Sequence, residues 1–383
     1  MRNVRTKYVH AAENADFSVM VTELLSAYRP QGIPVRMVFF GSPESNVSFC
    51  QQKERICTGI SQKYGEHSPV VSYIAQTPLD GSGMVLEVHE ILPEAGDRLE
   101  YKRFENIPYI VLSGKEGDLL FLGAVSGADI DASVQRQSEE IFTKIQKVLQ
   151  AENMPVNAIV RQWNYLERIT GFEGDIQRYQ AFNDARSVFY EQTEWECGYP
   201  SATGIGTSFG GVQVELQAFL PKQDGKMPVA LDNHLQIAAH AYSQQVLLGQ
   251  KNSGLKMKTT PKFERAKLVF TPIEKIIYIS GTAAIRGELS LIDSDIQSQT
   301  LATLENIEYL ISAESQLKAG MQDGNDARIE SFRIYVKHIS DMEKCKAVVS
   351  QRYLDVPVIY VKADICRDEL LVEIEGVALS KIN

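Results

Sequence analysis

Apolar residues with strand-like and helix-like spacing follow one another along the chain in an order that occurs twice. Residues 118–125 (DLLFLGAV) and 274–283 (EKIIYISGTA) are short apolar runs ending in small residues, which is typical of a strand that leads into a tight turn. Behind them, residues 135–152 and 297–314 carry apolar side chains at helical spacing. Each of these segments therefore predicts an amphipathic helix whose apolar stripe lies on a sheet.

A second predicted strand follows each helix, at Ala158–Tyr165 and at Ser331–His338. The register is kept between the two copies, because Gln137 and Gln299 hold the same place in their helices, 162 positions apart. Strand, helix and strand in the same order at a nearly constant offset indicate an internal duplication.

The duplication extends toward the end of each copy. Arg178–Tyr190 and Met342–Tyr353 predict a second helix in each copy, and the runs VQVELQAFL and LLVEIEGVAL predict the closing strands. The polar segment Leu220–Pro228 contains Gly and Pro and is the expected linker. We therefore predict an α/β (α+β) fold of two tandem modules, each a mixed β-sheet backed by helices: residues 1–222 with an N-terminal extension, and residues 223–383.

Composition narrows the class of protein. The chain has 383 residues, of which 44% are hydrophobic and 23% charged, as in ordinary globular proteins. Its net charge of −10, without a dense basic run, makes nucleic acid a poor partner. No signal-like or membrane-spanning apolar segment is evident, so a cytoplasmic location is expected. Five scattered cysteines and six histidines without metal-binding spacing predict neither a disulfide framework nor a metal site.

The order of the predicted elements, with SG after the first strand and LVEIEG at the end, resembles the YjgF/Rid family of small proteins. Two such modules fused in a chain of this length resemble the chorismatases. The stretches RQWNYLERI, RYQAFNDAR, YPSATGIGT, YISGTAAIRGE and ADICRDELLVEIE are similar to the chorismatase signature in order and spacing, from about Ala158 to the end of the chain.

The resemblance implies an enzyme that cleaves the enolpyruvyl ether of chorismate to pyruvate and 3-hydroxybenzoate, or to a related hydroxybenzoate or dihydroxycyclohexadienoate. It implies no cofactor, a small anionic substrate and a monomer or small homo-oligomer. Protonation of the methylene carbon of the enol ether needs a general acid that stays protonated near neutral pH. A carboxyl group achieves this when it is buried away from cations or lies beside another carboxylate.

Glu373 fits the role of that acid. In the alternating run LVEIE, Glu373 and Glu375 share one face of a predicted strand, about 7 Å apart. Two carboxyls at this spacing raise the pKa of one of them if the face is enclosed, whereas a solvated strand face is the alternative interpretation. The resemblance places the catalytic glutamate of the family at Glu373.

The same resemblance assigns the other candidate site residues. Cys366 falls at a position that lines the family's pocket, where we interpret it as a residue that steers the product and not as a nucleophile, since no His or Lys in its local sequence favours a thiolate. Arg186 and Arg265 match arginines of the family pattern and suit a planar carboxylate, and Arg178 and Arg161 are weaker candidates. Surface salt bridges are the alternative role for these arginines.

Small residues complete the candidate site. We expect Gly204, together with Gly206, and the pair Gly281–Thr282 to let backbone amides approach the ligand. TGIGTSFGG is not followed by a predicted helix, which argues against a dinucleotide-binding loop.

Several positions depart from the family patterns. The cationic PxR pattern of Rid deaminases is absent, because Pro200 is followed by Ser201-Ala202 and Pro357 by Val-Ile. Glu288 stands where chorismatases usually have His, and the loop at 252–262 is shorter, so that Lys256 or Lys258 is a candidate for a lost cation. The missing cation argues against a Rid-type enamine or imine deaminase, which stays open on the module fold alone. Glu288 and the shorter loop leave a non-catalytic metabolite-binding protein as a second alternative.

Overall fold

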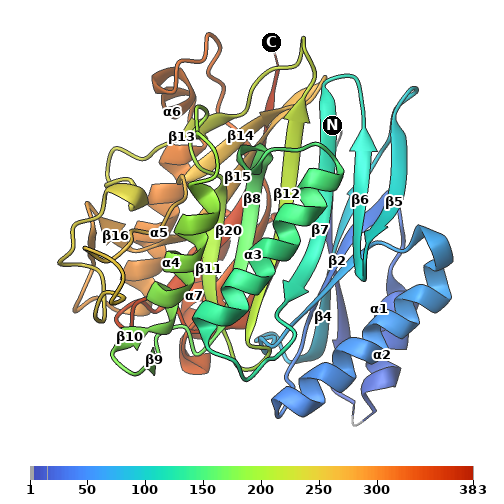
Figure 1. Ribbon diagram of the computed structural model, residues 1–383, viewed down its shortest axis with the longest axis horizontal. Helices are drawn as coiled ribbons and strands as arrows, with labels where there is room; N and C mark the ends of the chain where they lie inside the picture. Colours follow the sequence, from blue (N-terminus) through green and yellow to red (C-terminus); the bar gives the residue numbers. More distant parts are fainter. Residues whose placement is uncertain (1–3, 15, 383) are drawn as a thin grey trace.

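The computed structural model describes residues 4–14 and 16–382. Three large mixed β-sheets, of four, six and six strands, form its framework, and their helices lie on the outside, as Figure 1 shows; two two-stranded sheets are also present. Each large sheet belongs to one stretch of the chain, which we call the N-terminal unit (residues 5–91), the middle unit (residues 98–221) and the C-terminal unit (residues 229–381). The middle and C-terminal units are the two modules that the sequence predicts.

The middle unit has a six-stranded sheet in the order β11-β8-β12-β7-β6-β5. Its elements are β5 (Arg98–Phe104), β6 (Ile107–Ser113), β7 (Gly117–Ser126), α3 (Val134–Ala151), β8 (Ile159–Glu167), the two-residue strands β9 (Phe172–Glu173) and β10 (Ile176–Gln177), α4 (Arg178–Tyr190), β11 (Ser201–Thr207) and β12 (Val212–Pro221). Helices α3 and α4 lie side by side across one face of this sheet (Figure 1).

The C-terminal unit repeats this arrangement with the sheet order β13-β14-β15-β20-β18-β19. Its elements are β13 (Val229–Leu231), β14 (Ala266–Phe270), β15 (Glu274–Ala283), the short strands β16 (Ile285–Arg286) and β17 (Leu289–Ser290), α5 (Ile296–Leu310), α6 (Ala313–Lys318), β18 (Arg328–Val336), α7 (Met342–Arg352), β19 (Val358–Lys362) and β20 (Val372–Lys381). The predicted helix over 297–314 is divided in two, because the Ser312 hydroxyl accepts the backbone N–H of Ser315 and begins a new short helix.

The N-terminal unit is a third copy of the same order, which sequence analysis treated only as an extension. Its elements are β1 (Arg5–Ala12), α1 (Phe17–Ala27), β2 (Ile33–Phe40), α2 (Asn46–Tyr64), β3 (Val70–Ile74) and β4 (Ser82–Ile91), with the sheet order β1-β4-β2-β3. In all three units the last strand lies antiparallel between the first and second strands of a strand–helix–strand–helix–strand–strand sequence. The second and third strands are parallel in each.

Each unit buries apolar side chains between its helices and its own sheet, and a further core joins all three units. Val38 from β2, Tyr165 from β8 and Val361 from β19 belong to this shared core. The predicted boundary at 222/223 falls between β12 and β13, and the division of the chain into two domains there remains a proposal. No helix in the described part of the chain is long and apolar enough to cross a membrane.

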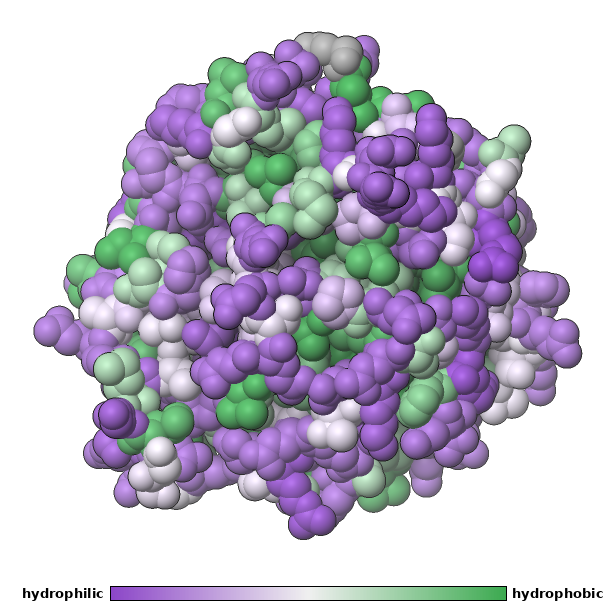
Figure 2. All heavy atoms as spheres, turned by 45° about the horizontal axis from the view of Figure 1, so that its top comes forward, coloured by the Kyte–Doolittle hydropathy of each residue, from purple (hydrophilic) through white to green (hydrophobic). Residues whose placement is uncertain are grey.

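Hydrophilic side chains predominate on the face shown in Figure 2, and hydrophobic atoms lie there in small separate groups. This face shows no broad apolar patch. Small, separate groups of hydrophobic atoms are normal on the surface of a globular protein.

Candidate active site

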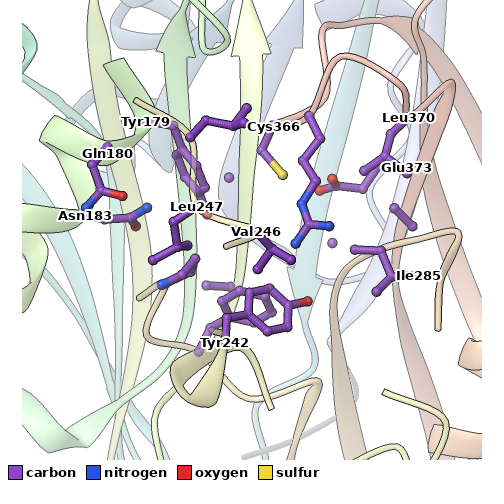
Figure 3. Close-up of a pocket in the computed structure, with 18 of the residues that line it drawn as sticks. Tyr179, Gln180, Asn183, Tyr242, Val246, Leu247, Ile285, Cys366, Leu370 and Glu373 are labelled. Carbon is purple, nitrogen blue, oxygen red and sulfur yellow. The ribbon is translucent and has the colours of Figure 1, made fainter. Parts of the chain in front are cut away.

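A pocket lies where the middle unit meets the C-terminal unit (Figure 3). Helix α4 and strand β11 form one side, and β15, β20 and the segment before β20 form the other. Residues 232–263, which we call the lining loop, contribute further walls through Tyr242, Leu247 and Phe263. The space measures about 800 Å³ including its open mouth.

Glu373 points into this pocket from β20 (Figure 3). Its side chain is only 5% exposed, and its register partners on the neighbouring strands are Ala283 and Tyr335. The ladder between β15 and β20 shifts register between Ile279 and Thr282, at a position where Gly281 faces the carboxyl. A β-carbon at position 281 would lie 2.0 Å from Oε1 of Glu373, so any larger residue there would displace the carboxyl.

The pKa of Glu373 is raised from its ordinary value to about 8. Burial is the main cause, and the negative charge of Glu375 adds to it, while Arg161 and Arg265 act in the opposite direction. Among the residues that the structure describes, none donates a hydrogen bond to the carboxyl or forms an ion pair with it. Glu373 is therefore protonated near neutral pH and free to donate its proton to a ligand.

Glu375 has the opposite environment although it lies on the same face of β20. Its carboxylate accepts hydrogen bonds from Arg161 at 2.9 Å, from the indole of Trp163 at 2.8 Å and from the hydroxyl of Thr203, and it pairs with Arg333 at 3.1 Å. These partners hold it in the interior where the three units meet. The predicted pair of carboxyls is thus present, with one member fully paired and the other unpaired in the pocket.

Two buried arginines line the pocket without a carboxylate partner. Arg186 on α4 is 1% exposed, and Arg265 before β14 is 3% exposed. Arg186 donates to Oδ1 of Asn183 at 2.6 Å, and Arg265 donates to the backbone oxygen of Ile237 at 2.6 Å and to the hydroxyl of Tyr242 at 2.8 Å. Neither forms an ion pair with any described residue, and the Nε atom of each is buried without an acceptor. Buried charges are normally paired, so this pocket suits an anion.

A third arginine, Arg367, also lines the pocket. It was not predicted from the sequence, although it belongs to the ADICR motif that carries the resemblance. Its guanidinium donates to the backbone oxygen of Glu288 at 2.9 Å and to the hydroxyl of Ser290 at 3.1 Å. It also lies over the ring of Tyr242, 5.3 Å from the ring centre. Tyr242 therefore contacts Arg265 and Arg367 and links the lining loop to both cations.

Cys366 lies in the pocket near Glu373 (Figure 3). Burial, and secondarily the charge of Glu373, raises the pKa of its thiol to about 12. The thiol is therefore neutral at physiological pH.

The two departures from the family pattern concern the lining loop. Glu288 accepts hydrogen bonds from the backbone N–H and the hydroxyl of Ser243, both at 2.7 Å, and so fixes the loop next to Tyr242. Neither Lys256 nor Lys258 lines the pocket. The Lys258 ammonium donates instead to the backbone oxygen of Leu247. The suggestion that one of these lysines supplies a cation to the pocket is therefore wrong, and Arg367 is the additional cation found there.

The remaining predicted residues divide into those that reach the pocket and those that do not. Gly204 lines it, and a β-carbon there would lie 2.9 Å from the ring of Tyr179. Thr282 does not line it, since its hydroxyl donates to the backbone oxygen of Ser280 at 2.8 Å. Arg178 is also absent from the lining, because its guanidinium binds Glu173 and the backbone oxygen of Glu167.

We therefore no longer assign Thr282 and Arg178 to the substrate. The part of the chain that the structure describes contains no group of His, Cys, Asp and Glu side chains suited to a metal ion. The chemistry that the pocket offers is proton transfer from Glu373 beside three guanidinium groups.

Fold and pocket together define a protein of three repeated α+β units with an acid–arginine site between two of them. Residues 97–218 match the family described as chorismatase FkbO/Hyg5-like, N-terminal. A crystal structure of a chorismatase superposes with a TM-score of 0.71 at 20% identity and covers 98% of each chain, which establishes the fold.

Two curated proteins are similar to part of the chain. A 3-hydroxybenzoate synthase of Streptomyces hygroscopicus is 28% identical over 238 residues, which span 60% of this chain and 65% of the relative. A chorismatase of Streptomyces rapamycinicus is 29% identical over 226 residues, which span 57% of this chain and 64% of the relative. The chain is thus similar to the chorismatases in part of its sequence and in its fold.

Proposed function

We propose that this protein cleaves the enolpyruvyl ether of chorismate to pyruvate and 3-hydroxybenzoate, with Glu373 as the general acid. The observation that carries the proposal is the carboxyl of Glu373, which is enclosed, free of hydrogen bonds and protonated near neutral pH within a pocket of three arginines. The names of the related 3-hydroxybenzoate synthase and chorismatases support the choice of substrate and product.

The pocket matches the charge of chorismate. This substrate has one carboxylate on its ring and one on its enolpyruvyl group, and Arg186, Arg265 and Arg367 are the cations available to them. A guanidinium binds a planar carboxylate through two parallel hydrogen bonds. The unsatisfied Nε atoms of Arg186 and Arg265 are donors that such a ligand could engage.

The reaction begins when Glu373 transfers its proton to the methylene carbon of the enol ether. The resulting positive charge lies on the ether carbon, and the ionised Glu373 beside it stabilises that charge. Cleavage of the bond between the ring and the ether oxygen then releases pyruvate and leaves the positive charge on the ring. Migration of the neighbouring ring hydroxyl to that carbon and loss of a ring proton to Glu373 give the hydroxybenzoate and restore the acid, so the two products together contain the atoms of chorismate. Cys366 lies next to Glu373, where it can direct the ring toward the aromatic product.

The test is incubation of the protein with chorismate, followed by chromatographic identification of the aromatic product and enzymatic measurement of pyruvate. Glu373→Gln keeps the shape of the side chain but removes the acid, so turnover should fall by about 10²–10⁴-fold while chorismate still binds. Absence of pyruvate from the wild-type reaction, or near-normal turnover by Glu373→Gln, would contradict the proposal. Ammonia release from 2-aminoacrylate with chorismate inert would favour the deaminase instead.

The proposal includes a cytoplasmic location and a monomer or small homo-oligomer. Sedimentation of the purified protein at several concentrations would measure the oligomeric state directly.

A further inference from the structure

A second large cleft lies between the N-terminal and middle units, at the place that corresponds to the candidate active site. In the candidate site, strand β11 lies against β15 of the next unit, and α4 covers one side. In the second cleft, strand β3 lies against β7 of the next unit, and α2 covers one side. The repeated order of elements makes β3 the counterpart of β11, β7 of β15 and α2 of α4.

Matching hydrogen bonds support the correspondence of the two clefts. The backbone N–H of Gly281 on β15 donates to the hydroxyl of Thr203 on β11 at 3.0 Å. The backbone N–H of Ala124 on β7, which holds the same register position, donates to the hydroxyl of Ser72 on β3 at 3.0 Å. The second cleft has about 1800 Å³ of space including its open mouth.

Two lysine ammonium groups converge in the second cleft. Lys53 on α2 donates to the hydroxyl of Ser126 at 3.2 Å, and Lys144 on α3 donates to the backbone oxygen of the same residue at 2.9 Å. Lys144 also pairs with Glu140 at 2.6 Å, whereas Lys53 has no carboxylate within 4.0 Å among the described residues. Burial lowers the pKa of Lys53, and the charge of Lys144 adds to that effect.

The surroundings of these ammonium groups indicate the kind of anion that suits them. Lys102, Arg103 and Glu66 also line the cleft. Lys102 pairs with Glu152 at 2.8 Å, Glu140 neutralises Lys144, and Arg103 and Glu66 have opposite charges, so the lining keeps one positive charge, which matches a monoanion such as a carboxylate. Ile60, Ile107 and Pro108 make part of the wall apolar, so the ligand is expected to carry an apolar part.

We propose that this second cleft binds a small organic carboxylate, whose charge is held by Lys53 and Lys144. We expect no acid catalysis in this second cleft, because the residue that occupies the position of Glu373 in the middle unit is Gln213. Gln213 pairs with Tyr165 and Ser126 as Glu373 pairs with Tyr335 and Ala283. The proposal does not depend on the function proposed for the first pocket.

Cysteines already present in the chain report on each site separately. Cys57 lines the second cleft one helical turn after Lys53, Cys50 is exposed on the same helix outside the lining, and Cys366 lies in the candidate active site. The experiment measures the rate of iodoacetamide alkylation of each cysteine in the full chain by peptide mass spectrometry. Benzoate serves as the carboxylate probe, and benzamide as its uncharged counterpart.

We expect benzoate to slow the alkylation of Cys57 in a saturable manner and to leave Cys50 unchanged. Lys53→Gln should weaken this protection about tenfold in apparent affinity, because it removes one charge-assisted hydrogen bond. Lys53→Arg keeps the charge and should retain protection, as should the control Lys147→Gln, a variant of an exposed lysine on α3. Rates are compared with and without benzoate within each variant, since Lys53 itself influences the thiol of Cys57.

Three results would overturn the proposal. If benzoate does not slow the alkylation of Cys57 in the wild type, the second cleft does not bind a carboxylate. Equal protection by benzamide shows that the lysines do not recognise the carboxylate, and equal protection by inorganic phosphate shows that the cleft does not select an organic acid. Protection of Cys366 is read independently and reports on the first pocket alone.

Discussion

Replacement of Glu373 by Gln should stabilise the folded protein at neutral and alkaline pH. The carboxyl is 5% exposed and has no hydrogen-bond donor among the described residues, so its ionised form has no compensation for lost hydration. In the folded protein its pKa is about 8, against an ordinary value of 4.5. Between these two values the folded state holds a proton that the unfolded state has released, and stability therefore falls as the pH rises.

The size of this effect follows from the pKa shift. Each pKa unit corresponds to about 1.4 kcal/mol, so the free energy of unfolding should decrease by about 1.4 kcal/mol for each pH unit between pH 5 and 8 because of this group alone. Between pH 5.5 and pH 7.5 the difference amounts to about 3 kcal/mol. Gln carries no titratable group, so Glu373→Gln lacks this dependence while it occupies nearly the same volume.

Urea unfolding of wild type and variant at pH 5.5, 6.5 and 7.5 measures the difference directly. We expect similar stabilities at pH 5.5 and an advantage for Glu373→Gln that grows with pH. Glu369→Gln, which changes an exposed carboxyl close by in sequence, should follow the wild type throughout. A difference that stays constant from pH 5.5 to 7.5 would refute the raised pKa of Glu373 and, with it, the argument that this group is the acid.

Four further results are expected. Turnover of chorismate, measured as pyruvate release, should decline as the pH rises through about 8 because the acid loses its proton; a rate that keeps rising to pH 9 contradicts this. Glu375→Gln should lower the free energy of unfolding by about 3–5 kcal/mol in urea titrations, since it leaves Arg161 and its neighbours uncompensated. Arg265→Gln should raise the KM about tenfold or more in the same pyruvate assay, while the exposed Arg168→Gln should not change it. Glu288→Gln should weaken the attachment of the lining loop at Ser243 and raise KM with little effect on kcat; unchanged KM would mean that this attachment does not shape the pocket.

The fold could be predicted where the periodicity of the sequence was strong. Residues 118–125 and 274–283 lie within β7 and β15, and the segment at 135–152 lies almost entirely within α3. The N-terminal unit was missed because its helix α2 is mostly polar, with only Phe49, Ile56 and Ile60 buried. So few apolar positions do not give a clear helical periodicity in the sequence, although the order of elements in this unit is the same as in the other two.

The candidate site was predictable only in part. Alternation along β20 put Glu373 and Glu375 on one face, but their different partners come from β8, β11 and β18, which no local pattern reveals. Tyr242 and Leu247 come from the lining loop, which has almost no regular structure and therefore no periodicity to read. Arg367 could have been predicted as a pocket residue from the sequence, since it ends the ADICR motif that carries the resemblance.

The three-unit fold accounts for the contrast between the two carboxyls of β20. Each last strand places one glutamate at the centre of the molecule: Glu87 on β4, Glu215 on β12 and Glu375 on β20. Arg36 binds Glu87 and Glu215, Arg161 binds Glu375, and Arg333 binds Glu87 and Glu375, so three arginines compensate three glutamates.

The position two residues before each central glutamate lies on the same strand face but outside this network. It is Val85 in the N-terminal unit, Gln213 in the middle unit and Glu373 in the C-terminal unit. A carboxyl occurs at this position in only one of the three copies, and there the central arginines are already engaged by Glu375 and its counterparts. Glu373 is consequently enclosed by the fold without being neutralised by it, and this is the property that a general acid requires near neutral pH.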